Sequence, residues 1–160
     1  MKKLLLILVL AVMFSSVVRA GDYADGTKAY EERDYVTALT LFFPLADQGS
    51  ATAQFNLGVM HENGIGVIKD FKKSVDWYRM AAEQGYVKAQ FNLALMYEGG
   101  KWLKKDYVLA HMWYNLAASK GDKSGTNNRD IVASQMSPAQ IAEAQKLAKE
   151  CEKKNYKNCD

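Results

Sequence analysis

Hydrophobic residues in the middle of the chain recur at the spacing of α-helices. Ala89, Leu93, Met96 and Tyr97 follow one another at i, i+4, i+7 and i+8, which places them on one side of a helix. A second stripe follows further along, formed by Tyr107, Ala110, Tyr114, Ala117 and Ala118. Runs in which hydrophobic and polar residues alternate, as in a strand, do not occur. The pattern therefore predicts an all-α protein built from short amphipathic helices.

Glycines and aspartates separate these predicted helices. The links at 63–66 and 99–100 are rich in glycine, which adopts the positive φ that a helix end requires. An aspartate follows at the position of a helix N-cap, at Asp34, Asp70 and Asp106. We therefore expect pairs of helices joined by short turns, each pair ending near Gly49, Gly85 or Gly121.

The helix pairs are copies of one unit. The segment AQFNLGVMHENGIGVIKDFKKSVDWYRMAAEQG at 53–85 returns at 89–121 as AQFNLALMYEGGKWLKKDYVLAHMWYNLAASKG, with an offset of 36 residues and no gap. The same offset aligns part of 34–49 with the second half of the unit. A period of this length is typical of a solenoid, in which each unit packs on its neighbours.

These copies divide the chain into one repeat domain at 21–160. We predict an incomplete first repeat at 21–49, complete repeats at 50–85 and 86–121, and capping helices at 122–160. Ser137, Pro138 and Gln140 have the spacing of a capping box with proline at the first helical position, and predict a final helix that runs to about Lys154.

The first 20 residues have the composition of a secretory signal peptide. Lys2 and Lys3 precede an apolar run from Leu4 to Phe14, and Ala20 stands at a small-residue cleavage site. The run is shorter than the roughly 20 residues that a membrane span needs. We expect cleavage after Ala20, no stable membrane insertion, and a periplasmic or secreted protein, and an uncleaved N-terminal anchor is the alternative.

Charge changes this picture little. The chain has 21 Lys and Arg against 18 Asp and Glu; removing Lys2, Lys3 and Arg19 with the signal leaves 18 of each. A neutral mature protein lacks the clustered positive charge with which proteins bind nucleic acid. We expect no nucleic acid partner, and we expect a monomer.

The two cysteines, Cys151 and Cys159, both lie in the last ten residues. In an oxidising compartment we expect them to form a disulfide that holds the tail on the last helix, and pairing between molecules is the alternative. The spacing differs from that of redox motifs, and two thiols without a neighbouring histidine do not suit a metal.

The repeated segment resembles a unit of the Sel-one-like repeat (SLR) family. The resemblance covers two full units at about 50–121 and part of a third. It implies an α-α superhelix related to tetratricopeptide repeats, and a scaffold or adaptor that binds other proteins. Two positions depart from the family pattern: Lys101, Trp102 and Leu103 replace a preferred glycine and valine, and Ala94 replaces a glycine. The exposed indole of Trp102 is either a contact point or folds back.

Candidate binding residues come from the same resemblance. Asn56, Asn92 and Asn128 recur in register, and in tetratricopeptide relatives an asparagine there holds a peptide backbone or terminal carboxylate in the concave groove. With Lys88 or Arg129 they would form a partial carboxylate clamp for a peptide or an envelope protein. The alternative is that the asparagines bond neighbouring helices and fix the stacking of units.

Catalytic chemistry has no motif here. His61 and His111 are the only histidines and belong to different units, where packing explains them. No nucleophile elbow, phosphate-binding glycine loop or paired metal-binding histidines occur, so we expect neither catalytic residues, nor a cofactor, nor a metal. A cell-wall or β-lactam hydrolase, or an inhibitor of an exported sensor domain, are the alternatives to a scaffold.

Overall fold

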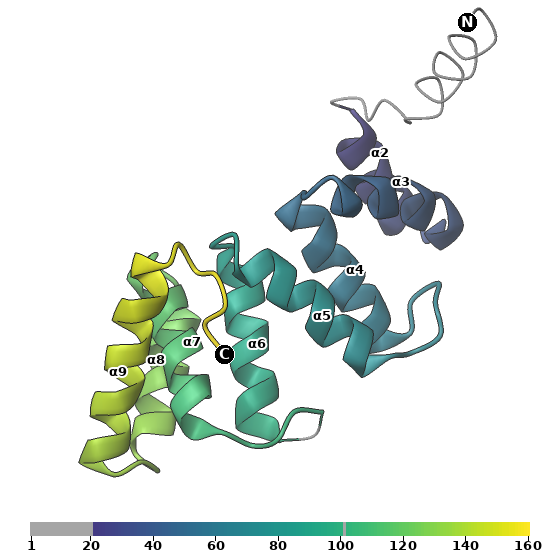
Figure 1. Cartoon of the computed structure of the whole chain (residues 1–160). Helices are drawn as coiled ribbons and strands as arrows, with labels where there is room; N and C mark the ends of the chain where they lie inside the picture. Colours follow the sequence, from purple (N-terminus) through teal and green to yellow (C-terminus); the bar gives the residue numbers. More distant parts are fainter. Residues whose placement is uncertain (1–20, 101) are drawn as a thin grey trace, which may run out of the picture.

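The computed structural model describes residues 21–100 and 102–160, and within these ranges it is all-α. The helices are α2 (Asp22–Glu31), α3 (Tyr35–Asp47), α4 (Ala51–Asn63), α5 (Phe71–Ala82), α6 (Val87–Gly99), α7 (Tyr107–Ser119), α8 (Lys123–Ala133) and α9 (Pro138–Lys153). Three consecutive pairs, α2 with α3, α4 with α5 and α6 with α7, follow one another along the molecule, and α8 and α9 both pack on α7 (Figure 1). The predicted all-α solenoid is confirmed. The predicted signal peptide at 1–20 lies outside the described residues.

The predicted N-caps begin the second helix of three successive pairs. Asp34 accepts from the Thr37 N–H, Asp70 from the Lys73 N–H, and Asp106 from the N–H groups of Val108 and Leu109, at 2.9 to 3.1 Å. Each carboxylate satisfies N–H groups that have no partner within the helix. The caps therefore fix where α3, α5 and α7 begin.

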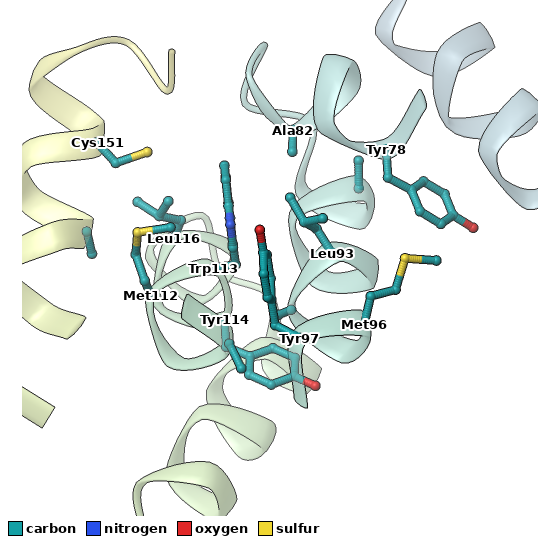
Figure 2. Close-up of a cluster of buried hydrophobic side chains, with 14 of the residues drawn as sticks. Tyr78, Ala82, Leu93, Met96, Tyr97, Met112, Trp113, Tyr114, Leu116 and Cys151 are labelled. Carbon is teal, nitrogen blue, oxygen red and sulfur yellow. The ribbon is translucent and has the colours of Figure 1, made fainter. Parts of the chain in front are cut away.

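The buried side chains form two clusters. The first lies among α2, α3 and α4 and contains Phe42, Leu57 and Met60. The second extends from α5 to α9 around Tyr78, Trp113 and Tyr114, all fully buried, as the close-up shows (Figure 2). Trp77 stands one repeat before Trp113, but it is only partly buried, against the first cluster.

The last helix closes the solenoid and turns the chain back. The side chain of Ser137 accepts from the Gln140 N–H, and the Gln140 side chain accepts from the Ser137 N–H, which completes the predicted capping box. Cys151 and Cys159 form the predicted disulfide within the chain. It holds the segment after α9 against the molecule, beside α6 (Figure 1).

None of the helices in the described ranges is long and apolar enough to cross a bilayer.

Candidate binding site

A pocket of about 470 Å³ lies where the end of α4 and the start of α5 meet α6. We call it the proximal pocket. Two of the predicted binding residues, Asn92 and Trp102, line it together. The remaining lining residues are Glu62, Asn63, Lys69, Phe71, Leu95, Met96 and Gly99.

A second pocket, of about 460 Å³, repeats the first one unit later, between α6, the start of α7 and α8. We call it the distal pocket. The offset of 36 residues pairs the lining residues of the two pockets: Glu62 with Glu98, Lys69 with Lys105, Phe71 with Tyr107, Asn92 with Asn128, and Leu95 with Ile131. Leu95 and Gly99 line both pockets, so the two are neighbours along one surface.

A buried tyrosine fixes the glutamate of each pocket. The Tyr78 hydroxyl donates to Glu62 Oε2 at 2.7 Å, and the Tyr114 hydroxyl donates to Glu98 Oε2 at 2.6 Å. Burial, and then the bond to Glu62, raise the pKa of the Tyr78 hydroxyl; burial and Glu98 raise the pKa of Tyr114 in the same way. Both hydroxyls therefore stay protonated and keep one carboxylate oxygen in place.

The asparagines are part of this network. Asn128 Nδ2 donates to the Tyr114 hydroxyl at 3.2 Å, and Asn92 bonds the Tyr78 hydroxyl in the same register. These bonds join one repeat to the next, as the stacking alternative expected. Both side chains also line a pocket, so a stacking role and a binding role are compatible.

Each pocket also carries a lysine over an aromatic ring. Lys69 Nζ lies 4.6 Å from the centre of the Phe71 ring, and Lys105 Nζ lies 4.4 Å from that of Tyr107. Such a contact favours one position of a flexible ammonium group. Each pocket thus presents an ammonium, a carboxylate and an amide at fixed places.

Trp102 extends the proximal pocket. Its indole stacks on Phe71, with ring centres 3.3 Å apart and an interplanar angle of 10°, while 51% of the residue remains exposed. The ring therefore folds back onto the preceding repeat and still offers a surface to a ligand. The fold-back alternative is therefore observed, and the role of Trp102 as a contact point stays a prediction.

The other predicted binding residues lie elsewhere. Asn56 Nδ2 donates to the Tyr23 hydroxyl at 3.4 Å and lines neither pocket. The repeat offset explains the difference, because Gly26 stands where Glu62 and Glu98 do, and Phe42 stands where the tyrosines do.

The two basic residues of the predicted clamp also lie outside these pockets. Lys88 is exposed on α6. Arg129 Nη2 lies 2.8 Å from Asp130 Oδ1, and its Nη1 donates to Asn115 Oδ1 at 3.3 Å. A ligand carboxylate at Asn92 or Asn128 would be repelled by the carboxylate of Glu62 or Glu98, which lines the same pocket. The sequence did not predict these glutamates at the site. The carboxylate clamp stays a prediction. An amide side chain can also donate to and accept from a peptide backbone.

Sequence reasoning missed the glutamates and lysines of the pockets. The identity of Glu62 with Glu98 was visible, but a charged residue near a helix end is usually a solvated one. The signal that could have found them is a glutamate and a tyrosine 16 residues apart in both complete repeats, Glu62 with Tyr78 and Glu98 with Tyr114.

The histidines are buried packing residues of α4 and α7. His61 and His111 are 5% and 2% exposed, and burial is the main cause that lowers the pKa of each. In the described part of the chain, no three His, Cys, Asp or Glu side chains gather as metal ligands would.

Comparison with known proteins identifies the repeat. The sequence pattern of the Sel1 repeat matches residues 17–50, 51–86 and 87–122. The mouse Protein sel-1 homolog 2 is 43% identical over 68 residues, which are 40% of this chain and 9% of the mouse protein.

Two crystal structures have the same fold. A protective antigen present in uropathogenic Escherichia coli strains, which displays an SLR fold, is 31% identical with a TM-score of 0.79 and matches 86% of this chain. A Sel1 repeat protein from Oxalobacter formigenes is 34% identical with a TM-score of 0.64 and matches 67% of this chain. The chain spans 30% and 44% of those two structures.

Proposed function

The chain belongs to the Sel1 repeat family, whose members are typically protein-binding scaffolds, and from that premise we propose that it binds a peptide or an envelope protein along its two pockets. The family is generally non-catalytic, and the proposed role needs no cofactor. We also propose that the units divide at the boundaries expected from the sequence, with residues 122–160 as the cap.

The observation that carries this proposal is the repetition of one polar constellation. An ammonium, a carboxylate and an amide recur in the proximal and distal pockets with the same neighbours. The repeat fold itself accounts for the buried Tyr78 and Tyr114, but a solenoid can be packed without an open pocket at each junction. A ligand that reaches both pockets must be extended, as a peptide segment or a surface loop is.

Leu95 gives this surface an apolar centre. It lines both pockets and is 42% exposed, and Ile131 lies beyond it with 55% exposed. Exposed apolar side chains flanked by fixed polar groups are the usual anatomy of a protein interface. The partner would therefore present apolar side chains toward Leu95 and Ile131, and backbone amides toward Asn92 and Asn128.

The location proposed from the sequence is the periplasm or the medium. The predicted cleavage after Ala20 supports it, and so does the disulfide, because disulfides persist mainly in oxidising compartments. The partner would then be another exported protein or an exposed segment of an envelope protein.

Site-specific photo-crosslinking tests the proposal. A photoreactive phenylalanine analogue replaces Leu95, and in a matched protein it replaces Gln145, which is exposed on α9 away from both pockets. We expect a discrete crosslinked protein from the native exported fraction with the probe at Leu95 alone. The same product from both positions would show that the contact is non-specific, and its absence at Leu95 would refute binding at the pockets.

Variants then assign the contact to residues. Replacing both Asn92 and Asn128 by alanine should abolish the crosslink, whereas Asn127→Ala, an exposed asparagine beside the distal pocket, should leave it unchanged. Thermal melts of each variant verify that the fold is kept. Lys88→Ala and Arg129→Ala test the basic residues of the predicted clamp, and a crosslink that survives the loss of both asparagines would contradict the proposed site.

A further inference from the structure

The segment after α9 occupies a built site between α5 and α6. The side chain of Asp160 is 1% exposed, Arg79 Nη2 lies 2.9 Å from its Oδ2, and Arg79 Nε donates to its Oδ1 at 3.2 Å. The Tyr97 hydroxyl donates to the same carboxylate. The bond to Asp160 raises the pKa of the Arg79 guanidinium above its usual range, while burial and Asp160 raise the pKa of Tyr97 to about 12.

Three further contacts hold the same segment. The Tyr156 ring lies over Gly85, so close that a methyl group on Gly85 would meet Tyr156 Cε2 at 3.1 Å. The Asn158 N–H donates to Glu83 Oε1 at 3.1 Å, and Lys157 Nζ lies 4.0 Å from Glu83 Oε2. The site therefore binds a segment with an aromatic residue (Tyr156), a lysine directly after it (Lys157), and an acidic residue three positions after the lysine (Asp160).

The segment after α9 covers part of the second core cluster. Tyr156 and Cys159 pack against the cluster that contains Trp113, which is fully buried. Trp113 and Tyr97 both belong to this cluster (Figure 2). The segment thus covers an aromatic surface at the junction of two repeats.

The same surface exists one repeat earlier, and there it is open. The offset of 36 residues maps the five site residues as follows: Gly85 onto Gly49, Glu83 onto Asp47, Arg79 onto Phe43, Tyr97 onto His61, and Trp113 onto Trp77. A methyl group on Gly49 would have no neighbour within 4 Å, in contrast to Gly85.

Apolar side chains remain uncovered at this earlier junction. Phe43 is 37% exposed and Met80 is 42% exposed. With His61 and Trp77 they line a cavity of about 280 Å³, which Lys73 and Asp76 border. We call the surface formed by these cavity residues together with Asp47 and Gly49 the vacant junction.

We propose that the vacant junction binds an extended segment of a partner protein with an aromatic residue, a lysine directly after it, and an apolar residue three positions after the lysine. The glycine and the acidic residue of the site recur as Gly49 and Asp47, so the aromatic residue and the lysine keep their partners. Phe43 and His61 replace the arginine and tyrosine that hold Asp160, so the last residue of the segment must be apolar. A second copy of this chain fits poorly, because its own segment carries Asp160 at that position.

This surface is separate from the two pockets. No residue that lines the cavity of the vacant junction also lines either pocket. A variant at Phe43 therefore tests the vacant junction, whereas variants at Asn92 and Asn128 test the pockets.

Peptide binding to the full chain tests the inference. Two fluorescent peptides of residues 151–160, each closed by its Cys151–Cys159 disulfide to limit the entropy lost on binding, differ only at the last residue. One retains aspartate and the other carries Asp160→Leu. We expect the leucine peptide to bind the wild-type protein about tenfold more tightly, because Phe43 and His61 stand where Arg79 and Tyr97 hold the carboxylate of Asp160.

The matched protein variants are Phe43→Arg and Val36→Arg. Both introduce an arginine at an exposed position of α3, but only Phe43 lies at the vacant junction. Phe43→Arg should reverse the preference and favour the aspartate peptide, whereas Val36→Arg should leave the order unchanged. The inference is overturned if neither peptide binds the wild-type protein at about 1 mM, or if Phe43→Arg does not alter the order of the two affinities.

Discussion

At the residue scale, a single hydroxyl organises each pocket. Tyr114 donates to Glu98 and accepts from Asn128, so it connects α6, α7 and α8 through one oxygen atom. A hydroxyl with the raised pKa of Tyr114 remains a donor over the whole physiological range. The glutamate of the distal pocket is therefore held by a partner that pH does not remove.

Removing that hydroxyl should cost more than a surface hydrogen bond. We expect Tyr114→Phe to lower the free energy of unfolding by about 1 to 3 kcal/mol, because it leaves the partly buried Glu98 without its donor. Urea unfolding measures the change. Tyr107→Phe is the control, since the Tyr107 hydroxyl donates to Gln135 at an exposed place and its loss should cost less than about 0.5 kcal/mol. Equal losses in the two variants would contradict the organising role of Tyr114.

At the element scale, local chemistry determines where the helices begin. The caps at Asp34, Asp70 and Asp106 and the capping box at Ser137 were predictable, because each involves residues within three positions of one another. The repeat period likewise predicted which helices pair. The end of the chain was a different problem, because Asp160 and Arg79 are 81 residues apart and no local pattern joins them.

Pocket residues were predictable only where the repeat marked them. Asn92 and Asn128 recur and do line the pockets, whereas Asn56 recurs but lacks the glutamate and tyrosine that build one. Register alone predicted a third equivalent position, but Asn56 lines neither pocket, so its binding role stays a prediction. The vacant junction was likewise hidden, since Phe43 and His61 have no counterparts of the same type in the next unit.

The cap of α7 should be the most informative one to remove. Asp106→Ala withdraws the acceptor of two backbone N–H groups, those of Val108 and Leu109, and we expect it to lower the free energy of unfolding by about 1 to 2 kcal/mol. Asp106→Asn should restore most of the loss, because asparagine caps helices about as well as aspartate does. Chemical denaturation measures both, and an equal loss for the two variants would show that the charge, not the cap, matters.

At the scale of the whole molecule, the two core clusters limit how far a destabilising change in one half affects the other half. The disulfide ties the tail to the second cluster, which contains Cys151 and the residues of α5 to α9, while the first cluster lies among α2 to α4. A solenoid transmits stability mainly between neighbouring units. A change at one end should therefore fade toward the other.

Loss of the disulfide tests this division. We expect Cys159→Ser to lower the free energy of unfolding by about 2 to 3 kcal/mol, from the loop that the bond closes. Hydrogen exchange followed by mass spectrometry should accelerate in α7 to α9 and leave α2 to α4 nearly unchanged. Acceleration of equal size in both regions would contradict separate clusters.

The repetition of the pockets also has a consequence for stoichiometry. A short ligand that fits one pocket finds a similar place in the other, so titration should end at two ligands per chain. If the two affinities were equal, the first ligand to bind would gain about 0.4 kcal/mol because it has two places to bind. A longer ligand that carries the pocket-binding sequence twice, at the spacing from Asn92 to Asn128, binds one per chain and in a single register. Once its first copy is bound, the second copy is held at a high local concentration near the other pocket. Two weak sites can in this way select a long partner over many copies of a short one.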